Sequence, residues 1–113
     1  MAKTNPVFMS GVPELLVLRL LSREEMYGYE LVRAIRVVSE NAFNLAEGVI
    51  YPLLHTLEAR KMLKAKEKNI SGRTRVYYSL TQKGEKRLEE MKKEWCRINN
   101  GINTVMDSDG ITE

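Results

Sequence analysis

Basic residues are concentrated in one short stretch of the sequence, residues 61–75. They alternate with other residues in its first half and follow a glycine in its second half: Lys64, Lys66, Lys68, Arg73 and Arg75. Such a cluster binds nucleic-acid phosphates by releasing counterions, which gives affinity without sequence preference. The alternative is a solvated strand edge that lysines protect from pairing. The two arginines after Gly72 favour nucleic acid, because a flexible basic tip can probe a groove.

A second group of candidate contacts precedes this stretch, at the outward positions near the start of a predicted helix. It combines hydrogen-bonding side chains with one glycine: Asn44, Glu47, Gly48, Tyr51 and His55. Gly48 allows a close approach of backbone to phosphate, and Tyr51 can donate its hydroxyl to phosphate or stack on a sugar or base. Glu47 can accept a hydrogen bond from cytosine, although a helix-capping role fits it equally well. These residues indicate base readout by a helix in the major groove.

The sequence contains no candidate residues for catalysis or for binding a metal. One histidine, His55, and one cysteine, Cys96, cannot by themselves build a zinc site, and a single cysteine excludes an intramolecular disulfide. The sequence has no Gly-rich phosphate loop, nucleophile elbow or paired-histidine motif. We therefore predict a protein that is not an enzyme and that needs neither a cofactor nor a metal.

The composition is that of one small globular domain. The chain has 113 residues, of which 43% are hydrophobic and 29% charged, and its net charge is +3. This mild excess of positive charge is compatible with nucleic acid but does not require it. The apolar run Leu15–Leu21 is interrupted by Arg19, and no window reaches the roughly 18–20 apolar residues of a membrane span. These features predict a soluble, cytoplasmic protein without a membrane partner.

Hydrophobic periodicity predicts the elements that position the candidate contacts, beginning with two helices. The first covers about residues 10–22 and is mostly buried, with Pro13 near its start. The second covers residues 27–39. Because the link between them is short, we expect the two helices to pack as neighbours.

A third helix is predicted within residues 44–62, where leucine and valine repeat at every fourth position. Asn44 with Glu47 resembles a capping box, which favours a start at Asn44. Pro52 either bends this helix or marks a later start. We favour a bend, because the apolar spacing continues across the proline.

Two strands follow, at residues 63–68 and 75–80, joined by a hairpin loop at residues 69–74. In the second strand Tyr77 lies on the opposite face from Tyr78. The three lysines of the first strand alternate, so they project from one side. Three helices followed by a hairpin predict an α+β, mostly α fold, the winged helix-turn-helix, for residues 1–80.

The longest helix is predicted for residues 81–106, and residues 107–113 form a polar tail that we expect to be flexible. Apolar residues recur along the helix at spacings of three and four: Leu88, Met91, Trp95, Ile98, Ile102 and Val105. This is the seam of a helix that pairs with another helix. It spans roughly 27 Å, which is long for so small a body. We predict a homodimer; the alternative is that the seam covers the chain's own core.

Three segments together resemble the small subgroup of the PadR family of transcriptional regulators, which has a single C-terminal dimerisation helix. They are Met-Tyr-Gly-Tyr-Glu-Leu at residues 26–31, Leu-Ala-Glu-Gly-Val-Ile-Tyr-Pro-Leu-Leu at 45–54 and Gly-Arg-Thr-Arg-Val-Tyr-Tyr-Ser-Leu-Thr at 72–81. The resemblance extends over about residues 12–105. It implies a dimeric repressor whose third helix and wing contact double-stranded DNA at a palindromic operator. Tyr27, in the first segment, is a further candidate DNA contact.

The sequence departs from the family pattern at three positions. Val49 stands where a threonine is usual, which removes a hydroxyl contact with DNA. Ala46 stands where a serine is frequent, which leaves Asn44 as the expected helix cap. Lys61 stands where a glycine is usual at the turn into the wing, so it must take a left-handed conformation or change the turn.

The resemblance also raises the question of an effector. Some members of the subgroup are multidrug sensors that bind flat aromatic compounds between paired tryptophans at the dimer interface, and Trp95 falls at the corresponding place. An indole can stack on a planar aromatic compound or cation, but it can equally serve as interface core. The first hypothesis is therefore a pseudo-palindromic DNA-binding repressor. The alternatives are a sensor-repressor with its effector at Trp95, and a winged-helix module for protein contacts.

Overall fold

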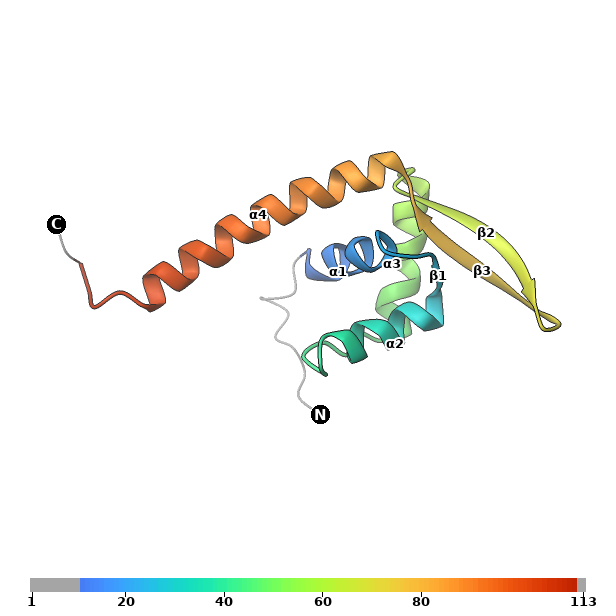
Figure 1. The fold of residues 1–113 in the computed structure, drawn as a ribbon, viewed down its shortest axis with the longest axis horizontal. Coiled ribbons are helices and arrows are strands. Elements are labelled where there is room, and N and C mark those ends of the chain that lie inside the picture. The colour runs from blue at the N-terminus through green and yellow to red at the C-terminus, as the bar shows by residue number, and fades with distance from the viewer. Residues whose placement is uncertain (1–10, 112–113) are drawn as a thin grey trace.

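The computed structural model describes residues 11–111. Three helices form a compact body, from which a hairpin projects at one end and the distal half of a long helix at the other (Figure 1). The molecule therefore measures 65 × 34 × 20 Å. The elements are α1 (Val12–Leu21), β1 (Met26–Tyr27), α2 (Gly28–Val38), α3 (Glu47–Ala59), β2 (Leu63–Ile70), β3 (Arg73–Leu80) and α4 (Gln82–Met106).

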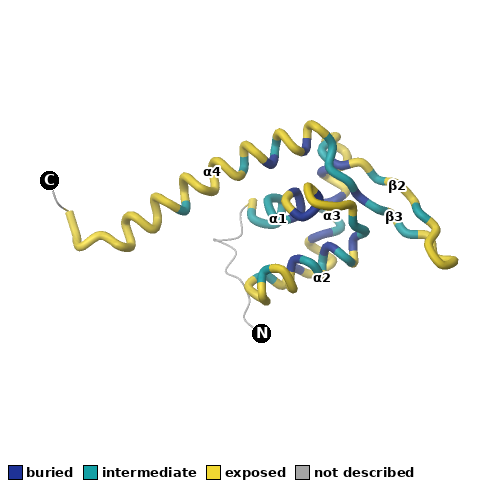
Figure 2. Tube along the Cα trace, in the orientation of Figure 1, coloured by how far each residue is buried: buried dark blue, intermediate teal, exposed yellow. Residues whose placement is uncertain are grey.

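The core lies where α1, α2 and α3 meet under the base of the sheet, as the buried segments in Figure 2 show. Val17 and Leu18 of α1 are completely buried, which confirms that this helix is mostly enclosed. The predicted start of α1 at Ser10 lies outside the described residues. Among residues 11–111 no helix is long and apolar enough to cross a membrane.

The start of α3 differs from the prediction. The helix begins at Glu47, after an extended Ala46 whose side chain makes no capping hydrogen bond, so the capping box at Asn44 is wrong. The segment before it is not helical, and its Leu45 is buried in the core. Pro52 lies inside the helix and does not start it; the bend stays a prediction.

The end of α3 is closed by a Schellman motif built on a lysine. The Lys61 N–H donates to the Glu58 carbonyl and the Met62 N–H to the Leu57 carbonyl, both at 2.9 Å. Lys61 has a φ of 66°, so the residue takes the left-handed conformation that its place in the sequence requires. The turn into the wing is thus kept without glycine.

The same turn is joined to the start of α4. The Thr81 hydroxyl donates to the Lys61 carbonyl at 2.7 Å and accepts from the Gly84 N–H at 3.1 Å. Gly84 is required there, because a β carbon would lie 2.3 Å from the Met62 carbonyl oxygen. The end of the third helix, the base of the wing and the fourth helix therefore meet at one junction.

The hairpin of β2 and β3, hereafter the wing, is longer than predicted. Ile70 and Arg73 already pair, so a two-residue turn replaces the predicted loop at 69–74. Ser71 and Gly72 have φ of 54° and 78°, the sign pattern of a type I′ turn, whose twist matches that of the strands. The antiparallel sheet has the order β1-β3-β2. Its short strand β1 was not predicted.

The fourth helix divides its apolar seam between two environments. Leu88 is 4% exposed and belongs to the chain's own core, and Met91 packs against that core. Arg87 binds Glu14 of α1 at 2.8 Å, and this hydrogen bond raises the pKa of the arginine. From Trp95, which is 51% exposed, to Val105, which is 73% exposed, the seam lies open.

Candidate nucleic-acid interface

All the cations predicted for the wing lie on one face of the sheet. Residues opposite each other in an antiparallel pair share a face, and the register pairs Lys64 with Ser79, Lys66 with Tyr77, Lys68 with Arg75 and Ile70 with Arg73. We call this set the basic face: Lys64, Lys66, Lys68, Arg73 and Arg75. The opposite face carries the buried residues of the wing, Leu63 and Tyr78, so the basic face points away from the core.

Two tyrosines form the base of the basic face. Tyr27 of β1 pairs with Tyr77 of β3, and their rings meet edge to face at 5.4 Å between centroids. The Arg75 guanidinium lies 4.3 Å from the centroid of the Tyr27 ring. Cation–π contact therefore holds this arginine against the body of the protein. Tyr27 was a predicted site residue, whereas Tyr77 was not, although strand alternation places it with the lysines.

Lys68 has an acidic partner that sequence reasoning missed. Its ammonium binds the carboxylate of Glu25, the residue before β1, and lies 5.0 Å from the centroid of the Tyr77 ring. Glu25 and Lys68 are 43 positions apart, so no local sequence signal could have found the pair. Of the five cations in the basic face, Lys68 is the one that an acid neutralises within the described residues.

The predicted contacts of α3 divide into exposed residues and one packing residue. The exposed ones are Asn44, Glu47, Gly48 and His55. No atom lies within 4 Å of the place a β carbon would take at Gly48, so the backbone there is open to a ligand. Tyr51 is half-buried, and its ring covers Gly28 at the start of α2. Tyr51 thus fixes the position of α3 beside Tyr27 and the basic face.

Burial also affects the tyrosine beneath the wing. Desolvation raises the pKa of the Tyr78 phenol above its ordinary value, and the nearby Glu58 carboxylate and Tyr51 act in the same direction. The phenol is therefore held neutral at the contact between sheet and core. No group of His, Cys, Asp or Glu in residues 11–111 is arranged to hold a metal ion.

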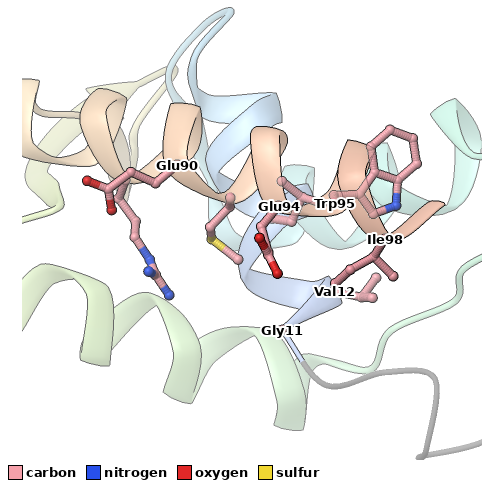
Figure 3. A pocket seen from close by; sticks show the side chains of 9 residues that line it. Gly11, Val12, Glu90, Glu94, Trp95 and Ile98 are labelled. Carbon is pink, nitrogen blue, oxygen red and sulfur yellow. The ribbon is translucent and has the colours of Figure 1, made fainter. Parts of the chain in front are cut away.

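Two cavities lie on either side of Trp95. One, of about 280 Å³, lies between the start of α1 and α4, and Glu90 lies at the opposite end of it from the Trp95 indole (Figure 3). The other, of about 370 Å³, is lined by apolar residues of α1 and by Phe43, and the cations Arg19 and Lys92 also line it. Arg97 hydrogen-bonds to Glu94 and lowers the pKa of that carboxyl, and Arg87 also lines the first cavity, so each of its two carboxylates has a cation nearby.

Three helices, an exposed helix N-terminus and a basic hairpin define a winged helix-turn-helix protein. The sequence profile of the transcriptional regulator PadR-like family matches residues 17–90, and the chain belongs to that family. This confirms the family, the fold class and the general role in transcription regulation that the sequence predicted.

Solved structures and curated relatives agree with this assignment. The PadR-like regulator BC4206 of Bacillus cereus is 34% identical, with a TM-score of 0.80 over 91% of this chain and 99% of that one. A PadR family regulator of Clostridium difficile R20291 is 34% identical, with a TM-score of 0.73 over 85% and 99%. Transcriptional regulator YqjI of Escherichia coli is 32% identical over 87 residues, which are 77% of this chain and only 41% of YqjI.

Proposed function

We propose that the protein is a cytoplasmic, homodimeric repressor that binds double-stranded DNA at a pseudo-palindromic operator. The observation that carries this proposal is the basic face, which holds Arg73 and Arg75 on the same side as the lysines of β2. Residues 1–80 form the DNA-binding unit, residues 81–106 the dimerisation helix and residues 107–113 a tail. The family to which the chain belongs supports the regulatory role.

In this proposal α3 selects the sequence and the wing supplies affinity. The N-terminal end of α3 enters the major groove, where Asn44, Glu47 and His55 reach base edges and the open backbone at Gly48 approaches phosphate. The cations of the wing bind phosphates, whose contribution is the same on any sequence. Tyr51 acts by packing, as its contact with Gly28 indicates.

The exposed part of α4 supports the homodimer. Four seam residues from the middle to the end of the helix remain uncovered in the single chain: Trp95, Ile98, Ile102 and Val105. A second copy that covers this seam with its own seam buries all four. Leu88 was predicted to belong to the interface, but its side chain is already used in the chain's own core. Met91, also predicted for the interface, packs against that core as well, so the exposed seam that we propose for the dimer begins at Trp95.

Fluorescence anisotropy of labelled duplexes tests DNA binding by the wing. We expect the double substitution Arg73→Ala with Arg75→Ala to weaken binding at low salt and to flatten its salt dependence, by about 0.9 in the slope for each lost phosphate contact. Lys92→Ala with Lys93→Ala on α4 is the control of equal charge change. Unchanged binding by the arginine variant would contradict DNA binding by the wing and would favour a protein-interaction module.

A second candidate function, sensing of a planar aromatic compound, is supported by the cavities at Trp95. The indole offers a stacking surface that borders both cavities. We expect such a compound to quench Trp95 fluorescence and to release bound DNA. A broad panel of planar aromatic compounds that neither quenches nor releases DNA would count against the sensor.

A further inference from the structure

One cross-strand pair of the wing consists of two cations, of which one is ion-paired and the other is not. Lys68 and Arg75 are opposite each other in the register, and both reach back over a tyrosine ring. Lys68 is also bound to the Glu25 carboxylate. Arg75 forms no ion pair with an acidic side chain among residues 11–111. The two cations are therefore not equivalent toward an approaching polyanion.

The pair of Glu25 and Lys68 carries no net charge. Their side chains are 40% and 33% exposed, so the pair lies at the surface where DNA would pass. An ammonium with a carboxylate beside it attracts a DNA phosphate only weakly, because the two opposite charges cancel at the distance of the DNA backbone. If Lys68 turns to a phosphate, the carboxylate of Glu25 stays nearby and repels it.

We propose that Glu25 sets the strength of sequence-independent DNA binding by neutralising Lys68 on the basic face. The inference rests on the proposed DNA-binding function. Phosphate contacts strengthen binding to every sequence equally, whereas base contacts discriminate. By removing one effective cation from the wing, Glu25 lowers the affinity for DNA of every sequence by the same factor.

The test measures the affinity for a random-sequence duplex as a function of salt for four forms of the full chain. These are the unaltered protein, Glu25→Gln, Glu25→Gln with Lys68→Met, and Lys66→Met as a control for an unpaired lysine. We expect Glu25→Gln to steepen the slope of log affinity against log salt by about 0.9, which tightens binding about eightfold at 0.1 M salt. The double variant restores the original slope, and Lys66→Met flattens it by the same amount.

Two results would overturn the inference, and they are distinguishable. If Glu25→Gln leaves the slope unchanged while the double variant flattens it, Lys68 already engages phosphate in the unaltered protein and Glu25 has no such role. If no form binds DNA in a salt-dependent way, the DNA-binding function itself fails. Circular dichroism of each variant shows that the fold is kept, since an exposed ion pair adds little to stability.

Discussion

The ring of Tyr51 lies directly on the backbone of Gly28, so that a β carbon at residue 28 would come within 2.5 Å of ring carbon Cε1. This contact joins the middle of α3 to the first residue of α2. Because Tyr27 precedes Gly28 and touches both Tyr77 and Arg75, a continuous series of contacts links α3 to the wing. The two parts proposed to contact DNA are thereby held in a fixed relation.

We expect Gly28→Ala to lower the free energy of unfolding by about 1–3 kcal/mol, the usual cost of forcing extra volume into a packed site. Urea denaturation measures this. Gly48→Ala is the matched control, because no atom lies within 4 Å of its added carbon and alanine favours a helix. Equal stability of the two variants would show that the contact between Tyr51 and residue 28 is not tight.

Lys61→Gly is expected to stabilise the protein by about 0.5–1 kcal/mol, because the left-handed conformation that Lys61 takes is strained for a residue with a β carbon. Thermal and urea unfolding both report the gain. The neighbouring Arg60 has a φ of −85°, so Arg60→Gly should destabilise the protein instead. A loss of stability in Lys61→Gly would contradict the Schellman turn.

Stability should fall at alkaline pH through Tyr78. Burial raises the pKa of its phenol in the folded state, so the contribution of this group is fully present below its ordinary pKa of about 10 and is lost as pH rises through the folded value. Tyr78→Phe removes this part of the decline, whereas Tyr29→Phe, at an exposed position, leaves it. Ultraviolet titration of tyrosinate that shows no late-ionising residue would contradict the prediction.

Dimerisation through α4 should be visible in Trp95, which is half exposed in the single chain. We expect blue-shifted emission in the dimer, and a red shift with dissociation in Ile102→Asp, since a carboxylate at an apolar interface raises the dimer Kd at least about a hundredfold. Thr104→Asp introduces the same charge off the seam. If light scattering finds a dimer in both variants, the apolar seam of α4 is not the dimer interface.

The local spacing of apolar and charged residues predicted most of the fold, because each helix or strand buries one of its faces. The alternation of Lys64, Lys66 and Lys68 was sufficient to place them together, since strand geometry has a period of two. The spacing of apolar residues likewise located α1, α2 and α4 to within a few residues. These features depend on neighbours in the sequence.

The features that were missed depend on contacts between distant segments. Glu25 reaches the wing because it precedes β1, whose two residues are too few to show a pattern, and the pairing of Tyr27 with Tyr77 depends on the same strand. The predicted helix start at Asn44 was wrong, because the segment that carries the buried Leu45 is not helical and the N-cap position is Ala46. Seam spacing is the same whether a residue packs in the chain's own core, as Leu88 does, or against a second copy, so periodicity could not divide the seam.

The most direct test of the proposed function is a footprint of the purified protein on DNA fragments selected from its own genome. We expect two protected half-sites related by a dyad, with centres about 10–10.5 base pairs or a multiple of this apart, and loss of protection in the variant with Arg73→Ala and Arg75→Ala. A footprint without dyad symmetry, or protection that survives loss of both arginines, would contradict a dimer that binds through the wing.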